Sequence, residues 1–244
     1  MIRNISKVLS ALLIYPTVEI QNAADEMRAI VEAEPRLSAA LREALTTLIG
    51  DIAESDIYDA QERYVLLFDR TRSLSLYLFE HVHGESRDRG QAMVDLQELY
   101  ERNGLHLSAK ELPDFIPLFL EFLAVQPEDE ASSLLAQPVH IFAALAERLA
   151  KRHSPYEAVF RALVALSASA PKRDEVSALL QEPDADATDL AALDAAWEDQ
   201  PVSFGAGGDS SGCKDELITR IRAGRRPAPG VAGAHPQRPA EPQA

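Results

Sequence analysis

Apolar residues recur along this chain at the spacing of an α-helix. Between residues 38 and 52, for example, Leu41, Leu45 and Leu48 fall three or four positions apart, which places them on one face of a helix. A period of about 3.6 residues runs through nearly every segment before residue 180, whereas no segment shows a convincing alternation of apolar and polar positions. The pattern therefore predicts an all-α protein.

Proline residues and polar clusters divide this pattern into about nine to eleven helices joined by short connections. The expected helices span residues 5–12, 23–34, 38–52, 55–68, 73–81, 86–103, 115–123, 128–136, 139–151, 156–168 and 174–180. The helix from residue 115 is apolar nearly all round, so we expect it to lie at the centre of the fold. No repeat of fixed length appears, and the chain is therefore expected to form a single globular helical bundle.

Two local signals mark the connection around residues 103–111. Asn103 and Gly104 should end one helix, because glycine adopts a left-handed backbone conformation at little cost. Ser108 and Glu111 have the S-x-x-E spacing of a capping box, which should begin the next helix.

The composition of the chain changes after residue 181. Residues 201–244 hold six of the fifteen prolines and seven of the eleven glycines, and such a segment buries too little apolar surface to offset its ordering entropy. We expect a helical domain at 1–182, a docking segment with Trp197 at 183–204, and a disordered Pro/Gly-rich tail at 205–244. Within the docking segment, the amphipathic stretch LDAAWEDQPVSF (193–204) is expected to pack on the chain's own core.

The charge of the chain limits its partners. A net charge of −15 argues against a general nucleic-acid binder, which needs basic residues to neutralise phosphates, and against adsorption on an anionic membrane. It suits a basic partner segment.

No stretch approaches the roughly 20 apolar residues of a membrane span, and the N-terminus lacks the long apolar region of a signal peptide. The single cysteine, Cys213, fits a reducing compartment, so we expect a cytoplasmic protein.

The densest group of charged and histidine side chains follows two apolar helical rows. The rows are Tyr64, Leu67, Phe68 and Leu74, Tyr77, Leu78, His81; the charged corner is Glu80, His81, His83, Glu85, Arg87, Asp88, Arg89. On a helix, His81 and His83 would point roughly 200° apart, so they do not easily chelate one ion. No third histidine or cysteine lies nearby to complete a zinc site.

The carboxylates of this charged corner have two interpretations. They can form a salt-bridge network with the neighbouring arginines, or they can carry out acid–base chemistry. Apolar rows beside a charged rim also suit a groove that accepts a helix. Common catalytic motifs such as G-x-S-x-G, a Walker loop and H-E-x-x-H are absent from the sequence.

Several stretches resemble one known family. They read LLIYP (12–16), DAQERYVLLFDR (59–70), FEHVHGESRDRGQAM (79–93), LHLSAKELPDFIPLFLEFLA (105–124) and LDAAWEDQPVSF (193–204). In this order they resemble the assembly chaperones of membrane-bound respiratory nitrate reductase, a branch of the TorD/DmsD-like chaperones of molybdoenzymes. The likeness covers about residues 5–205.

The resemblance implies an all-α chaperone with no catalytic residue, no metal site and no cofactor of its own. Its partner would be the nitrate reductase α subunit, bound as the N-terminal peptide and as the apo αβ complex. Binding would allow insertion of the molybdenum cofactor and delay docking on the membrane subunit, and the chaperone would be absent from the mature enzyme. No nucleic-acid partner and no direct membrane insertion are expected. The chaperone is expected to be a monomer, with a dimer as the alternative.

The resemblance also implies a set of client-peptide-binding residues. Tyr64, Leu67 and Phe68 match a Y-x-x-L-F pattern; Leu74, Tyr77 and Phe79 would be groove walls; Glu80, His81, His83, Glu85, Arg87 and Arg89 match a charged corner; Glu111, Pro113 and Asp114 match an E-x-P-D signature. Phe115 follows where many relatives carry histidine, so a role that needs an imidazole there is in doubt.

Three alternatives stay open at this point. The chain could serve another molybdoenzyme of the dimethyl sulfoxide reductase family. It could be a metal-dependent hydrolase, which needs Glu80, His81, His83 and Glu85 to bind ions together. It could also be a structural subunit of a permanent complex, although its high charge is unusual for one.

Overall fold

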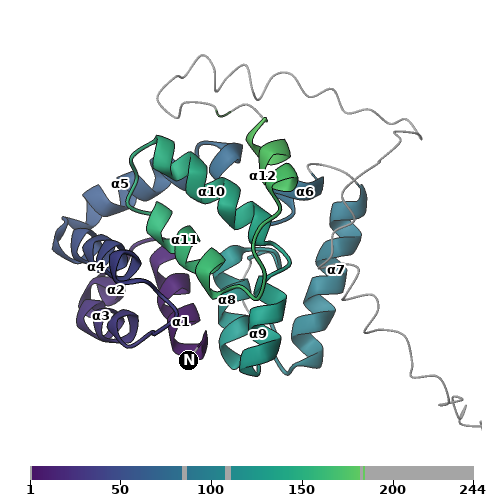
Figure 1. The fold of residues 1–244 in the computed structure, drawn as a ribbon, viewed down its shortest axis with the longest axis horizontal. Coiled ribbons are helices and arrows are strands. Elements are labelled where there is room, and N and C mark those ends of the chain that lie inside the picture. Colours follow the sequence, from purple (N-terminus) through teal and green to yellow (C-terminus); the bar gives the residue numbers. More distant parts are fainter. Residues whose placement is uncertain (1, 84–86, 108–110, 182–183, 185–244) are drawn as a thin grey trace, which may run out of the picture.

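The computed structural model describes residues 2–83, 87–107, 111–181 and 184, and in these ranges the chain is helical (Figure 1). The helices are α1 Ile2–Leu13, α2 Val18–Asn22, α3 Ala24–Glu32, α4 Ala39–Glu54, α5 Ile57–Phe68, the 3-10 helix η1 Arg72–Leu74, α6 Glu80–His83, α7 Arg87–Arg102, α8 Ile116–Val125, α9 Glu128–Leu135, α10 Val139–Lys151, α11 Glu157–Leu166 and α12 Arg173–Leu180. The described residues form no sheet; Tyr77 and Phe115 make an isolated antiparallel bridge. The all-α prediction is confirmed.

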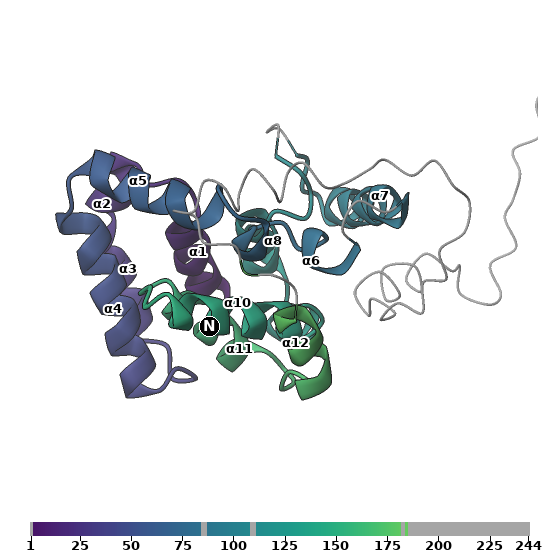
Figure 2. The ribbon, with the colours of Figure 1, turned by 90° about the horizontal axis from the view of Figure 1, so that it is seen from above.

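Helices α1 and α8 pack against each other at the centre of the fold (Figures 1 and 2). Helix α8 is the one that the sequence predicts to be central, and Phe119, Leu120 and Leu123 on it are fully buried. The Ser10 hydroxyl of α1 donates a buried hydrogen bond of 2.9 Å to the Pro117 carbonyl of α8. The two helices are therefore joined by polar as well as apolar contacts.

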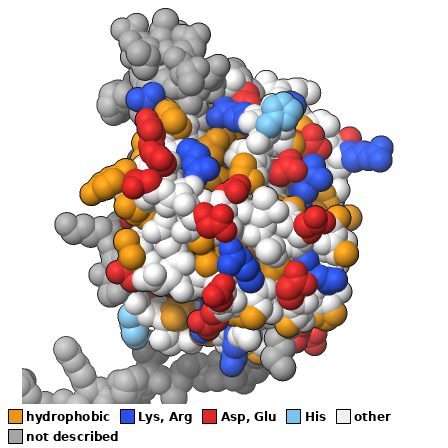
Figure 3. Space-filling model, turned by 90° about the vertical axis from the view of Figure 1, so that its left-hand side faces the viewer, with side chains coloured by type: hydrophobic (Ala, Val, Ile, Leu, Met, Phe, Trp, Pro, Cys, Tyr) orange, Lys and Arg blue, Asp and Glu red, His pale blue; other side chains and the backbone are white. Residues whose placement is uncertain are grey.

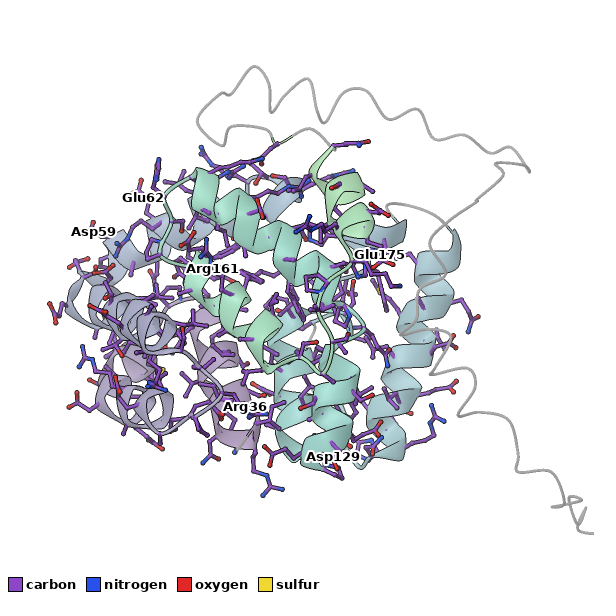
Figure 4. The ribbon with its side chains drawn as sticks, viewed as in Figure 1. Arg36, Asp59, Glu62, Asp129, Arg161 and Glu175 are labelled. Atoms are coloured by element: carbon purple, nitrogen blue, oxygen red, sulfur yellow. The ribbon has the colours of Figure 1, made fainter. Side chains whose placement is uncertain are left out.

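The remaining helices surround this pair. Helices α2 to α5 lie on one side, α10 packs on α11 and α12, and α7 stands at the opposite edge from α4 (Figures 1 and 2). On the side formed by α2 to α5, acidic and basic side chains are interspersed (Figure 3). Asp59 and Glu62 lie on the outer side of α5 (Figure 4). Of the helices in the described ranges, none has the length and apolar character needed to cross a bilayer.

The expected helix at 73–81 is wrong. Only Arg72–Leu74 and Glu80–His83 are helical there, and the backbone between them is not. It pairs instead with a distant segment: the Leu78 N–H donates to the Asp114 carbonyl at 3.0 Å, and the Ile116 N–H donates to the Leu76 carbonyl at 2.8 Å. These non-local hydrogen bonds replace the i to i−4 bonds that a helix would make.

Other helix boundaries differ in smaller ways from the expected ones. Helix α2, capped by the Thr17 hydroxyl at 3.4 Å, was not expected. Gly104 has a φ of 78°, which confirms the predicted left-handed helix end. The predicted capping box does not begin α8, since the residue that precedes α8 is Phe115 and Ser108 lies outside the described residues. The predicted docking segment, apart from Asp184, and the predicted tail also lie outside them.

Candidate functional site

The predicted site is built around the crossing of two segments, 75–79 and 113–116. Asp114 is fully buried at this crossing. Its carboxylate oxygen Oδ2 accepts a hydrogen bond from the Phe79 N–H at 3.0 Å, and its backbone carbonyl accepts one from the Leu78 N–H. Burial raises the pKa of Asp114, while the Phe79 N–H and the charge of Arg89 oppose that shift. Asp114 thus holds the two segments together from both its backbone and its side chain.

The outer edge of this crossing is partly exposed. The rings of Tyr77 and Phe115 lie 5.3 Å apart, and the Tyr77 hydroxyl donates to Glu111 Oε2 at 3.1 Å. Burial and the nearby Glu111 carboxylate raise the pKa of Tyr77 to about 12, so this hydroxyl stays protonated. Leu112 is also exposed here. Aromatic, aliphatic and acidic side chains therefore meet at one accessible edge.

The charged corner contains one of the ion pairs that the sequence suggests. Arg89 Nη2 lies 3.1 Å from Glu80 Oε1, which links the first turns of α7 and α6. His81 is buried, and its Nε2 lies 2.8 Å from the Ser75 carbonyl, so this nitrogen carries the proton and donates. Burial lowers the pKa of His81 and favours the neutral ring.

The other members of the charged corner are only partly described. His83 and Arg87 belong to α6 and α7, but their side chains are not described, and Glu85 lies outside the described residues. Within the described part of the chain there is no group of three or more His, Cys, Asp or Glu side chains that could hold a metal ion.

Most of the predicted groove walls are core residues. The Phe68 ring lies between Tyr64 and Tyr156, tilted to the first and edge-to-face with the second, with ring centroids 5.1 Å apart in both pairs. The Tyr64 hydroxyl donates to the Leu13 carbonyl at 3.0 Å, and burial raises the pKa of Tyr64. Leu74, Phe79 and Pro113 are also buried. The Pro113 carbonyl accepts a hydrogen bond from the Tyr100 hydroxyl at 2.8 Å. These side chains can shape a binding surface but do not form it.

A pocket of about 200 Å³ lies beside the accessible edge, between α7, α8 and the connection that joins them. We call it the α7–α8 pocket; it is lined by Tyr100, Leu105, His106, Leu107, Glu111, Leu118, Glu121 and Phe122. Apart from Glu111, none of these was singled out as a site residue from the sequence. The sequence does contain one signal for these lining residues: Leu105 and Leu107 follow Gly104 within a stretch that resembles the chaperone family.

A second pocket, of about 270 Å³, lies between α4, α5 and the connection from α10 to α11. We call it the α4–α5 pocket; Leu67 is the predicted site residue that lines it. The two pockets share no lining residue. Two residues of the predicted client-binding set, Leu67 and Glu111, therefore line different pockets.

The fold and the candidate site define an all-helical protein with apolar pockets bordered by acidic side chains. The family model described as the nitrate reductase delta subunit matches residues 34–162, and this chain belongs to that family. The resemblance seen in the sequence is thereby confirmed.

Named relatives agree with this family. The chain is 43% identical over 212 residues to the nitrate reductase molybdenum cofactor assembly chaperone NarJ of Escherichia coli strain K12, covering 87% of this chain and 88% of that protein. It is 40% identical over 200 residues to the probable assembly chaperone NarW of the same strain, covering 82% and 83%. It is 30% identical over 173 residues to the probable NarJ of Bacillus subtilis, covering 71% and 93%. By name these relatives are assembly chaperones, which supports the prediction that the chain is not an enzyme.

Proposed function

We propose that this protein is an assembly chaperone that binds the apo catalytic α subunit of a respiratory nitrate reductase. The observation that carries the proposal is the 43% identity to a nitrate reductase molybdenum cofactor assembly chaperone across 88% of that relative. The chaperone keeps the α subunit open to molybdenum cofactor insertion and delays its docking on the membrane subunit. It acts in the cytoplasm and leaves before the enzyme is mature.

The client segment is the N-terminal peptide of the α subunit, and it binds at the accessible edge beside the α7–α8 pocket. Among the predicted site residues, Tyr77, Glu111 and Phe115 are solvent-accessible, and Glu111 also lines the α7–α8 pocket. The pocket buries one or two apolar side chains of an amphipathic helix, in the manner of helix-in-groove recognition. Glu111 and Glu121 attract basic residues next to those side chains.

The buried members of the predicted set position this edge. Asp114 and Phe79 fix the crossing that presents Tyr77 and Phe115. His81 bonds to the Ser75 carbonyl and Pro113 accepts from the Tyr100 hydroxyl, so both hold the same region from the core. Tyr64, Phe68 and Leu74 are buried as well. Substitutions at the buried positions should therefore reduce stability first and client affinity only as a consequence.

The charged corner sets the position of α7, which forms one wall of the α7–α8 pocket. The Arg89–Glu80 pair connects the start of α7 to α6. We keep His83, Glu85 and Arg87, which lie next to the start of α7 in the sequence, as proposed client contacts. The corner is part of the binding surface in this proposal and has no catalytic role.

Co-purification tests the proposed function directly. The full chain, tagged and expressed with the cognate nitrate reductase, should capture the α subunit from cells that cannot make the molybdenum cofactor and should capture little of the mature enzyme. Glu111→Gln should capture less, because it removes one acidic charge but retains an acceptor for the Tyr77 hydroxyl. Glu26→Gln, which makes the same charge change at an exposed position on α3, should capture as much as the wild type.

Two results would contradict the proposal. Equal capture of apo and mature enzyme would indicate a structural subunit rather than a chaperone. Capture of a dimethyl sulfoxide reductase-type enzyme in place of nitrate reductase would assign the chain to another client.

A further inference from the structure

The α4–α5 pocket is not used by the proposed function. Its walls are mostly apolar and include Leu48 and Ile52 of α4, Leu66 of α5 and Tyr156. At about 270 Å³ it is smaller than the roughly 300–1,000 Å³ of typical small-molecule sites. A cavity of this size and character suits a large aromatic side chain.

One polar group in this pocket lacks a partner. Ser154 lines the pocket, and its hydroxyl is buried without a hydrogen-bond partner among the described residues. A buried hydroxyl of this kind costs free energy until it is hydrogen bonded. The natural occupant therefore brings an apolar body and a hydrogen-bonding group, which is the chemistry of an indole.

The chain itself leads toward this pocket. Asp184 is held by Arg152, whose Nη2 lies 2.5 Å from Asp184 Oδ1, and by the Ser73 hydroxyl, which donates to the same oxygen at 2.7 Å. Arg152 follows the last residue of α10 and lies two positions before Ser154. The C-terminal part of the chain therefore starts within a short distance of the pocket.

The stretch that follows Asp184 contains a suitable occupant. Leu193–Phe204 holds the single tryptophan of the chain, Trp197, together with Leu193, Val202 and Phe204. The nine residues from Asp184 to Leu193 can span at most about 30 Å when extended. Asp184 contacts the side chain of Arg152, which is two residues from Ser154, so this reach is long enough to bring Leu193 to the pocket.

We propose that Leu193–Phe204 folds back on the helical domain and seats Trp197 in the α4–α5 pocket, where its indole N–H donates to Ser154 Oγ. Arg63, an exposed residue at the rim that donates to the Ser55 hydroxyl, adds a positive charge next to Glu198 and Asp199, the two acidic residues after Trp197. The segment thereby covers Leu66 and Leu67, two partly exposed apolar residues of the pocket wall. This inference is independent of the proposed client and of the α7–α8 pocket.

Tryptophan fluorescence of the full chain tests the proposal, because Trp197 is the only tryptophan. In the native wild type, emission should be blue-shifted and quenching by acrylamide several-fold weaker than in the urea-unfolded protein. Leu66→Asp should shift the native emission to the red and restore strong quenching, since it places a charge in the pocket wall. The matched control Val94→Asp introduces the same charge at an exposed position on α7, and its fluorescence should stay like the wild type.

A second variant keeps the test decisive if Leu66→Asp unfolds the chain. Arg63→Glu changes an exposed rim residue and should preserve the helical circular dichroism while it increases quenching of Trp197. The proposal is overturned if native Trp197 is as exposed as in the unfolded chain. It is also overturned if Trp197 is shielded but neither a folded Leu66→Asp nor Arg63→Glu changes its fluorescence, because the segment then docks elsewhere.

Discussion

Asp114 offers the sharpest stability prediction, because one buried carboxylate bonds the two segments that cross at the candidate site. Replacement of Asp114 by alanine leaves the Phe79 N–H buried without its 3.0 Å acceptor. A stranded buried donor costs about 1–3 kcal/mol. For a chain of this length each kcal/mol corresponds to a fall in Tm of about 2–4 °C, so Asp114→Ala should melt about 2–12 °C below the wild type.

Asparagine at the same position separates the hydrogen bond from the charge. Asp114→Asn keeps an acceptor for the Phe79 N–H, so its loss at neutral pH should stay below about 1 kcal/mol. Because burial raises the pKa of Asp114, the folded protein holds this proton more tightly than the unfolded chain does. The stability that this group contributes is greatest below the ordinary aspartate pKa and is lost as the pH rises through the folded-state pKa. The cost of Asp114→Asn relative to the wild type should therefore grow as the pH falls.

Urea denaturation followed by circular dichroism measures these differences, with Asp59→Ala as the control. Asp59 lies on the outer side of α5, and its replacement should cost less than about 1 kcal/mol (Figure 4). Equal losses in Asp114→Ala and Asp114→Asn would show that the charge, and not the bond to Phe79, matters at this position. An Asp114→Ala protein as stable as the wild type would refute the reasoning altogether.

Three further predictions concern backbone conformation, a buried cation and pH. Gly104→Ala should cost about 1 kcal/mol in urea denaturation, because φ is 78° there, while an added Cβ meets no neighbour within 4 Å. Arg148→Met removes the donor to the Ser73 and Leu179 carbonyls and should lower the free energy of unfolding by about 1–3 kcal/mol for each of them. His81 has a pKa lowered by burial, so its contribution to stability is present above 6.5 and is lost as the pH falls; His81→Gln should flatten that part of the pH dependence of unfolding.

The helices were predictable because their signal is local. In α4 the buried positions recur every three or four residues and Ser38 caps the first turn, while Pro138 stands directly before α10. The segment 73–81 carries the same spacing, and Leu74, Leu78 and His81 are indeed buried. Its conformation is decided by hydrogen bonds to residues 114 and 116, which lie more than thirty positions away, and periodicity contains no information about such a partner.

The sequence predicts which residue types make up the candidate site, but not which of their side chains are buried. Tyr64 and Phe68 look like Tyr77 and Phe115 in the sequence, since all four are aromatic residues in apolar stretches. Tertiary contacts bury the first pair against Tyr156 and leave the second pair at the surface beside Glu111. The α7–α8 pocket is likewise formed by residues from both of its helices and their connection, so no single stretch could reveal it.

Calorimetric titration with a peptide that copies the N-terminal segment of the cognate nitrate reductase α subunit tests the central claim most directly. We predict binding to the full chain that weakens as salt is raised, because the acidic pocket attracts basic residues. Tyr77→Ala should lose most of the affinity, whereas Tyr58→Ala, at an exposed position on α5, should bind like the wild type. Absence of binding heat at micromolar protein, with the same chain still capturing the intact apo subunit, would contradict recognition of this peptide; equal binding by the two tyrosine variants would contradict its placement at the α7–α8 pocket.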